Sequence, residues 1–423
     1  MIRFRRSFFL FVASFFLQQM TGAQTQIFNP RIKSVKLYRS GDQLSFPVLP
    51  LNGNDVLQLE FDELDTRVNN YYYSFQLCNA DWTPSILTSF DYTRGFQSTR
   101  IGTYRNSSIA TTRYVHYQAT IPDRNSAPSR AGNYVLRVFL NNDTSQKVFT
   151  KRFVVVNTLA QIGAVVQQPF NARLFQSGQK LQLTIQTDKR INVLSPADLK
   201  VAVLQNQNWQ TALFMDRPTI WRGNYFEYSD EAITGIEAAR EFRWLDMRSL
   251  RLISDRMQTL DNRKDSVQVW VKPETTRTGQ PFIYYRDING SYTIETYESI
   301  NPFWQGDYAF THFRFVPPNR RPIEGSDVYI FGEMTNFAAD TTGLMHFNTE
   351  TGAYEKTLFL KQGYYNYLYA TRPVSGGTVD FSQTEGNNWS TENNYTVLVY
   401  YRPFGARADE CIAYTTLSSV FQR

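Results

Sequence analysis

The chain has 423 residues, a formal net charge of +6 and a hydrophobic fraction of 42%. This length is enough for about two to four domains, each with its own core. Two cysteines are too few for a disulfide scaffold, and no run of basic residues alternates with aromatic residues as in nucleic-acid-binding proteins. Composition therefore excludes a small disulfide-rich protein and argues against a nucleic-acid partner.

The first 23 residues have the pattern of a secretory signal sequence. Three arginines at positions 3–6 precede an apolar run at 8–17, and the small residues at 21–23 provide a cleavage site. The run is too short for a permanent membrane helix. The alternative, a buried N-terminal helix, fits the arginines less well. No cysteine follows the run, which excludes lipid attachment, and cleavage lowers the net charge to +3. Since no later segment is long and apolar enough to span a membrane, we expect a soluble mature chain.

The remaining sequence predicts a protein built almost wholly of strands. Short runs with alternating apolar and polar residues recur along the chain, bounded by turn residues. The clearest are Tyr71–Cys78, Tyr134–Leu140, Leu181–Gln186, Leu199–Leu204, Val267–Val271 and Val397–Tyr401. One segment, 230–245, carries Ala and Glu without an amphipathic stripe, and we expect a loop with one helical turn there. The fold class is therefore all-β, with three immunoglobulin-like or early-set β-sandwich domains in series.

Turn-rich segments suggest the domain boundaries. We expect a first sandwich at 28–157, a second at 158–273, and a third at 274–423 that begins with the linker-like stretch 274–281. Cys78 and Cys411 fall in different predicted domains. Two separate free thiols on strands are therefore favoured, with a disulfide in an exported protein as the alternative.

Motifs for catalysis are missing from the sequence. The histidines His116, His312 and His346 lack metal-ligand spacing, and neither a nucleophile elbow nor a phosphate-binding loop is present. We interpret each histidine as a hydrogen-bonded strand residue. Asp62, Glu63 and Asp65 are expected in a solvated turn, although a paired-carboxylate glycosidase site would need the same residue type. We expect no enzymatic activity, no cofactor and no metal site.

Aromatic residues in turn-rich segments are the best candidates for a binding surface. Most aromatic side chains of a sandwich belong to its core. Those in loops are candidates for partner contact, or alternatively cap the ends of the sandwiches. The candidate partner-binding residues are Trp82, Phe303, Trp304, Phe337 and Trp389.

The segment 327–370 resembles the early-set β-sandwich modules found beside starch-acting enzymes, including glycogen-binding domains. It reads D-V-Y-I-F-G-E-M-T-N-F at 327–337, followed by strands at 354–360 and at Tyr365, Tyr367 and Tyr369. Such modules bind and do not catalyse. The glycogen-binding pattern has Trp where this chain has Phe337, and Lys where it has Leu368. The resemblance therefore implies the fold more than sugar binding.

Motifs along the whole mature chain are similar to those of the plug protein family of the type IX secretion system. They are Y-Y-Y-S-F-Q-L-C-N-A-D-W-T-P-S (71–85), D-Y-T-R-G-F (91–96), Y-V-H-Y-Q-A-T-I-P (114–122), A-G-N-Y-V-L-R-V-F (131–139), E-F-R-W-L-D-M-R-S (241–249) and E-G-N-N-W-S-T-E-N-N-Y-T-V-L-V-Y-Y (385–401). The resemblance implies a non-enzymatic periplasmic protein, held at the outer membrane by the large β-barrel translocon whose periplasmic mouth it closes. The alternative is a periplasmic glycan-binding module.

Overall fold

The structure, a computed structural model, describes residues 25–263 and 265–420. The predicted signal sequence at 1–23 lies outside these residues. The described chain is almost entirely β, as predicted. Its α-helices are single turns: α1 (Ser89–Tyr92), α2 (Glu231–Thr234) and α3 (Pro302–Gln305). Three 3-10 turns accompany them: η1 (Pro196–Asp198), η2 (Pro318–Arg320) and η3 (Glu333–Thr335). No helix in this part of the chain is long and apolar enough to cross a membrane.

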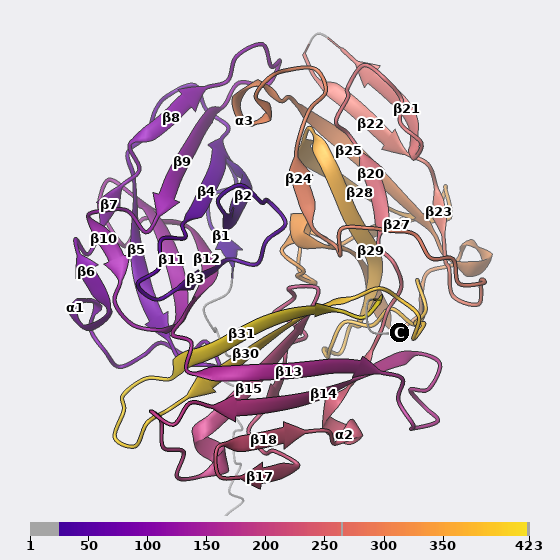
Figure 1. Cartoon of the computed structure of the whole chain (residues 1–423). Coiled ribbons are helices and arrows are strands. Elements are labelled where there is room, and N and C mark those ends of the chain that lie inside the picture. Colours follow the sequence, from indigo (N-terminus) through magenta and orange to yellow (C-terminus); the bar gives the residue numbers. More distant parts are fainter. Residues whose placement is uncertain (1–24, 264, 421–423) are drawn as a thin grey trace, which may run out of the picture.

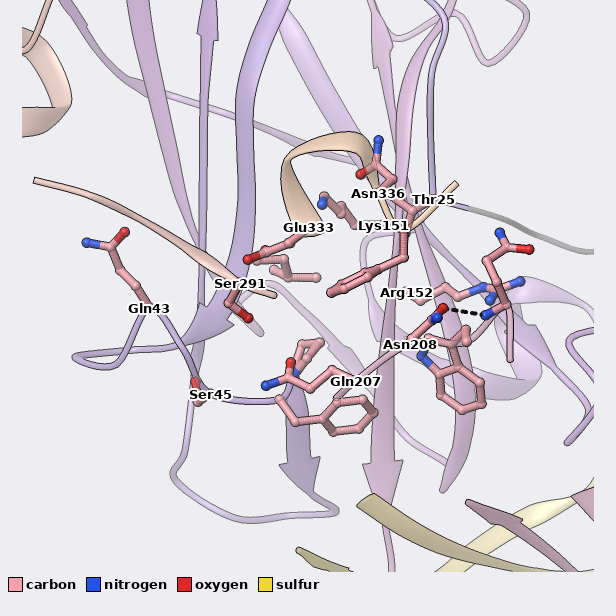
Figure 2. Close-up of a pocket in the computed structure, with 16 residues that line it drawn as sticks. Thr25, Gln43, Ser45, Lys151, Arg152, Gln207, Asn208, Ser291, Glu333 and Asn336 are labelled. Atoms are coloured by element: carbon pink, nitrogen blue, oxygen red, sulfur yellow. Dashed lines mark hydrogen bonds between the residues drawn. The ribbon is translucent and has the colours of Figure 1, made fainter. Parts of the chain in front are cut away.

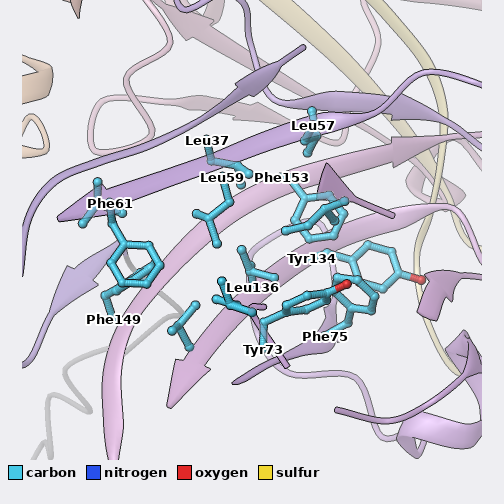
Figure 3. Close-up of a cluster of buried hydrophobic side chains, with 14 of the residues drawn as sticks. Leu37, Leu57, Leu59, Phe61, Tyr73, Phe75, Tyr134, Leu136, Phe149 and Phe153 are labelled. Carbon is cyan, nitrogen blue, oxygen red and sulfur yellow. The ribbon is translucent and has the colours of Figure 1, made fainter. Parts of the chain in front are cut away.

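The first sandwich consists of two large sheets and a short two-stranded sheet. One sheet contains β1 (Gln26–Ile27), β12 (Lys147–Val156), β11 (Gly132–Leu140), β5 (Tyr71–Cys78), β7 (Thr99–Arg100) and β3 (Val48–Pro50). The other contains β2 (Ile32–Arg39), β4 (Leu57–Glu63), β9 (Val115–Ile121) and β8 (Thr103–Asn106), and the two-stranded sheet pairs β6 (Thr93–Gly95) with β10 (Ser126–Pro128). Their inward side chains form one aromatic core, shown in Figure 3. Tyr134 lies opposite Phe153, and the two rings stack at 5.2 Å.

The middle sandwich also consists of two sheets, and its strands come from distant parts of the chain. One sheet contains β13 (Ala160–Gln167), β14 (Gly178–Thr187), β18 (Tyr225–Tyr228), β17 (Ile220–Arg222) and β19 (Gly235–Glu237). The other contains β16 (Leu213–Met215), β15 (Leu199–Gln205), β30 (Asn394–Tyr401) and β31 (Glu410–Ser418). Strand β14 shows the alternation that predicted it, because Leu181, Leu183 and Ile185 are buried in the core between the sheets.

The third sandwich encloses the second-largest aromatic core. One sheet contains β20 (Arg243–Asp246), β29 (Gly363–Pro373), β24 (Tyr292–Ile294) and β26 (Ser326–Phe331). The other contains β21 (Met257–Asn262), β22 (Val267–Val271), β25 (Tyr308–Val316), β28 (Ala353–Lys361), β27 (His346–Asn348) and β23 (Glu274–Thr275). Tyr365, Tyr367 and Tyr369 form one buried face of β29, as the sequence predicts.

Strand pairing differs from the predicted boundaries at 158–273 and 274–423. β30 and β31 lie beside β15 in the middle sandwich, so the chain returns to that sandwich after completing the third. β21 and β22 lie in a sheet with β25, so the third sandwich begins before residue 273. The alternating pattern identifies a strand but not the strand beside which it lies. Boundaries drawn at turn-rich segments therefore differ from the sandwiches that strand pairing defines.

The three sandwiches form a closed triangle rather than a row. Figure 1 shows the first sandwich and the third side by side, with the middle sandwich across their lower ends. Buried apolar side chains join the first and middle sandwiches, among them Phe46, Val154, Ala202, Leu398 and Tyr400. Each sandwich therefore packs against both of the others, and the contacts between them are where this fold brings polar chemistry together.

Candidate functional site

Five polar side chains meet in the interior where the first sandwich contacts the third. We call Glu60, Asp62, His116, Tyr308 and Lys361 the Asp62 cluster. One oxygen of Asp62 lies 2.7 Å from Nδ1 of His116. The other accepts hydrogen bonds from the hydroxyl of Tyr308, at 2.6 Å, and from the ammonium of Lys361. Asp62 and Lys361 are each only 1% exposed, so this ion pair is fully removed from water.

His116 is held as a cation at the centre of this cluster. Its Nε2 lies 2.5 Å from a carboxylate oxygen of Glu60, so each ring nitrogen faces a carboxylate. Burial alone would lower the pKa of His116, but the hydrogen bonds to Asp62 and Glu60 outweigh it and raise the pKa above its usual value. Lys361 and His116 together lower the pKa of Asp62, despite burial, which acts in the opposite direction. An imidazolium fixed at both nitrogens has no lone pair with which to act as a general base.

The position of these carboxylates corrects the predicted solvated turn. β4 continues to Glu63, and Asp62 and Glu63 are 1% and 2% exposed. Of the three acidic residues, Asp65 alone is near the surface, where it pairs with Arg31 at 2.8 Å. The counter-charge for Asp62 comes from a residue 299 positions later, which the local sequence does not show. Within the described residues, no three His, Cys, Asp or Glu side chains are arranged to hold a metal ion.

A second buried ion pair lies between the same two sandwiches. Lys36, on β2, is 1% exposed and its ammonium lies 2.7 Å from a carboxylate oxygen of Glu333 in η3. The ammonium also donates to the backbone carbonyl of Tyr292 at 2.7 Å and lies 4.2 Å from the centre of that ring. Two buried cations of different sandwiches therefore each have their own carboxylate, which fixes the register of one sandwich on the other.

Polar contacts also join the middle sandwich to the first. Asp409, which is 1% exposed, accepts a hydrogen bond from the backbone N–H of Ala80 at 3.0 Å and one from Arg402 at 2.7 Å. The hydroxyl of Tyr400 donates to Asn133 at 2.7 Å across the same contact. The first sandwich is therefore held at two separate sides by buried hydrogen bonds.

The point where all three sandwiches meet is hollow. Figure 2 shows a pocket there, with an empty volume of about 810 Å³ that is open to solvent. Its wall includes Lys151 and Arg152 of the first sandwich, Asn208 of the middle sandwich, and Glu333 and Asn336 of the third. A larger hollow of about 1510 Å³ between the first and third sandwiches shares Glu333 and Asn336 with it. We call the smaller hollow the junction pocket, and residues of all three sandwiches line it.

Two of the five candidate partner-binding aromatics are buried, which fits the alternative that loop aromatics cap the ends of the sandwiches. Trp82 is 3% exposed, and its ring meets that of Trp209 at 4.8 Å in an edge-to-face contact between the first and middle sandwiches. Phe337 is 8% exposed and packs against Phe331 in a small cluster that also contains Leu368. The ends of sandwiches pack on one another here, so these loop aromatics fill contacts within the chain.

The same burial bears on the sugar-binding alternative. Phe337 and Leu368 occupy the positions where the glycogen-binding pattern has its sugar contacts, and Leu368 is 0% exposed. Both side chains face Ala239 and Phe242 from the connection between the middle and third sandwiches. Leu368 is therefore not available to contact a sugar, whereas Phe337 keeps a small exposed part where it lines the junction pocket.

The other three predicted aromatics are half-buried at contacts between sandwiches. Phe303 and Trp304 belong to α3, and their rings lie 5.4 Å and 6.4 Å from the ring of His116. The guanidinium of Arg105 covers the ring of Trp304 at 4.7 Å. Trp389 is joined to β14 of the middle sandwich by a hydrogen bond from Gln179 to its backbone carbonyl. These residues position one sandwich on another, and contact with a partner remains a prediction for them.

The histidines and cysteines are placed largely as the sequence predicts. His312 on β25 has both ring nitrogens near polar atoms, of Thr357 at 2.9 Å and of Gln268 at 2.8 Å. Cys78 and Cys411 are both free and buried. Burial raises the pKa of Cys78 to about 12 and raises that of Cys411 as well, so both are unreactive thiols.

One exposed surface with aromatic side chains was missed by the sequence analysis. We define the aromatic–arginine patch as Ile86, Phe90, Arg130, Phe404 and Arg407. The three apolar members are 75%, 80% and 94% exposed. Arg130 links the two ends of this region, because its Nε donates to the carbonyl of Asp91 in α1 at 3.1 Å and its guanidinium lies 3.8 Å from the carboxylate of Glu410 in β31. Hydrogen bonds from Thr88 chiefly lower the pKa of Asp91, and the charges of Arg407 and Arg130 lower it further. Phe404 stands between Pro403 and Gly405, a turn signal that could have identified it.

A family model described as "Type 9 secretion system plug protein 1st domain" matches residues 32–157. A crystal structure of a hypothetical protein from Parabacteroides merdae ATCC 43184 is 30% identical, with a TM-score of 0.89 over 93% of this chain and 99% of that one. No curated protein matches. The similarity to the crystal structure covers all three sandwiches, so their closed arrangement is shared.

Proposed function

The chain belongs to the type IX secretion system plug protein family, and we propose that it is a non-enzymatic plug. In this proposal the protein lies in the periplasm and docks on the outer-membrane β-barrel translocon. It closes the periplasmic mouth of the barrel while no substrate passes. It is attached to the membrane only through this partner.

The observation that carries the proposal is the closed triangle of sandwiches with ionic contacts inside it. A cover over a wide aqueous opening has to keep its shape when it is supported only at its rim. Two ion pairs join the first sandwich to the third: Asp62 with Lys361, and Lys36 with Glu333. Three of these side chains are almost completely buried, and that of Glu333 is partly exposed. Breaking either pair would leave a buried charge without a partner, which is strongly unfavourable. The three sandwiches therefore support one broad rigid surface.

The chemistry of the Asp62 cluster also supports binding rather than catalysis. His116 faces a carboxylate with each of its ring nitrogens, and Asp62 is paired with Lys361. Side chains engaged in this way hold a structure together and leave no free base beside a substrate-sized opening. This agrees with the function of a plug, which requires no reaction.

The aromatic–arginine patch is the surface that we propose for docking. Its exposed Phe90 and Phe404 provide apolar anchors, and Arg130 and Arg407 provide the charge and planar donors that are enriched at protein interfaces. The structure leads us to choose this patch over Trp82 and Phe337, which are buried.

Co-purification with the barrel tests the choice of surface. Phe90→Ala/Phe404→Ala should leave the fold intact, because both side chains project into solvent, and should release the protein from the barrel. Truncating an interface anchor typically costs about 2 kcal/mol, or roughly thirtyfold in affinity. Phe170→Ala is a matched control, since Phe170 is 83% exposed but lies in the loop after β13, across the molecule from α1 in Figure 1. If the double variant co-purifies as well as the control, this patch is not the docking surface.

Deletion and fractionation test plugging itself. Cells lacking the protein should have an outer membrane that admits larger solutes, and in cells lacking the barrel the protein should be found in the soluble periplasmic fraction. Unchanged permeability on deletion would refute plugging. Retention at the outer membrane without the barrel would refute attachment through this partner. The Phe303→Ala/Trp304→Ala variant separates the two roles of α3: it should weaken the contact with His116, and it should release the barrel only if these residues also touch it.

A further inference from the structure

One cation of the junction pocket has no counter-ion. Lys151 lies on β12 and lines the pocket where the three sandwiches meet. In the described part of the chain its ammonium makes neither a hydrogen bond nor an ion pair. Burial lowers its pKa to about 8, with a further contribution from the charge of Lys36, although the charge of Glu333 acts against this. An uncompensated ammonium in this position is costly to the folded protein unless something binds to it.

The other charges at the pocket are already satisfied. The carboxylate of Glu333 accepts from Lys36 through both oxygens, at 2.9 and 2.7 Å, and also from the backbone N–H of Tyr292 at 3.2 Å. The guanidinium of Arg152 lies over the rings of Trp82 and Trp209, at 4.4 and 5.8 Å from their centres. Glu333 is paired with Lys36, so the ammonium of Lys151 lines the hollow without an ion pair of its own among the described residues.

The wall around Lys151 is suited to an organic ligand. The carboxamide of Asn336 makes no side-chain hydrogen bond among the described residues, and Asn208 uses its oxygen to accept from the backbone of Gln210, which leaves its amide nitrogen available. The rings of Phe46 and Trp209 form an apolar side of the same pocket. The pocket is open to solvent, so a carboxylate side chain can reach its wall without the sandwiches separating.

We propose that the junction pocket binds a ligand through a single carboxylate, with the ammonium of Lys151 as its counter-charge. One unpaired ammonium matches a monoanion. A phosphate dianion would bring a second negative charge close to Glu333, which has no free cation left to meet it. The amides of Asn208 and Asn336 would hydrogen-bond the polar part of the ligand, and the aromatic side would cover its apolar part. This site does not depend on plugging, and either can fail without the other.

A bound ligand of this kind would touch all three sandwiches at once. Lys151 belongs to the first sandwich, Asn208 to the middle one and Asn336 to the third. Occupancy would therefore stabilise the closed triangle against any separation of its parts, because a ligand that binds only the closed arrangement favours it by mass action.

The first test measures the pKa of Lys151 from its ¹³Cε resonance in protein labelled at lysine. The probes are the tripeptide acetyl-Ala-Glu-Ala-amide, the same peptide with Gln in place of Glu, and inorganic phosphate. We expect the Glu peptide at saturation to raise the pKa by about one unit or more, as a carboxylate within about 4–6 Å does. The Gln peptide should have no effect. No change with the Glu peptide, an equal change with the Gln peptide, or a change with phosphate alone would overturn the proposal.

The second test measures affinity for the Glu peptide by calorimetry. Lys151→Met should weaken binding about tenfold or more, the usual effect of losing a hydrogen bond to a charged group. Lys147→Met is the matched control, because Lys147 is exposed on the same strand and should leave the affinity unchanged. Equal affinities of the two variants would overturn the proposal. If Lys151→Met does not fold, the pKa measurement on the unaltered protein still decides it.

Discussion

Replacing Lys361 by methionine should destabilise the protein more than any change to a surface ion pair. The ammonium of Lys361 and the carboxylate of Asp62 are each 1% exposed, and they join β28 of the third sandwich to β4 of the first. Methionine keeps most of the length of the side chain and removes its charge. Asp62 would then be a buried carboxylate without its lysine, and the backbone carbonyl of Phe303 would lose a donor.

The magnitude follows from what remains around Asp62. Breaking a buried ion pair by removing one partner typically costs about 3–5 kcal/mol. Asp62 keeps its contacts with His116 and with the hydroxyl of Tyr308, so we expect the lower value, about 3 kcal/mol. Arg31→Met is the matched control on a surface pair, since Arg31 is 63% exposed in its contact with Asp65. It should cost about 0–1 kcal/mol.

A double-mutant cycle in urea distinguishes pairing from general damage to the interior. Unfolding of Lys361→Met, Asp62→Asn and the double variant is followed by tryptophan fluorescence, with hydrogen exchange of β9 and β28 as a local measure. The double variant should cost about 2 kcal/mol less than the sum of the single changes. If the costs simply add, or if Lys361→Met costs no more than Arg31→Met, the Asp62 cluster does not hold the first and third sandwiches together.

Three further predictions concern protonation, backbone strain and thiols. The pKa of His116 is raised above its usual 6.5, so its contribution to stability is complete below about pH 6.5 and is lost as the pH rises through the folded-state pKa. In a plot of the free energy of unfolding against pH, His116→Gln should therefore remove the fall in this pH range. Equal slopes for the variant and the unaltered protein would contradict the assignment. Ile109 is 74% exposed and has a φ of 58°, which is a strained conformation for a β-branched residue. Ile109→Asn should therefore raise the free energy of unfolding by about 1 kcal/mol. The control is Ile86→Asn at a similarly exposed position, which should not raise it. Cys78 and Cys411 should resist iodoacetamide at about pH 8 until urea is added, and rapid labelling of the native protein would show that one of them is accessible.

The strands could be predicted from the sequence because their evidence is local. Leu181–Gln186 and Val267–Val271 alternate between core and surface, and the structure has strands at both. Pairing is not local. β15 lies beside β30, which follows only after the complete third sandwich, and no residue of either strand identifies its partner. The predicted boundaries of the second and third sandwiches were misplaced for this reason.

The candidate site was harder to predict, because it consists of contacts between sandwiches. The sequence shows that Trp82 lies in a turn, but not that the middle sandwich covers the turn with Trp209. Likewise, Asp62 reads as part of an acidic turn until Lys361 is brought beside it. An exposed patch is equally hidden, because the charge of Arg407 acts on Asp91 of α1 only when β30 and β31 return to the middle sandwich.

The return of the chain to the middle sandwich determines the order in which the protein can be completed. During synthesis the first sandwich has all its strands once β12 has been made. The middle sandwich has to wait, with one edge of β15 unpaired, until β30 has been made near the end of the chain. An unpaired edge is a template for aggregation, so this interval is when the nascent chain most needs a chaperone. A chain shortened before β30 would lose two of the four strands of the sheet on which the first sandwich rests, rather than only a tail.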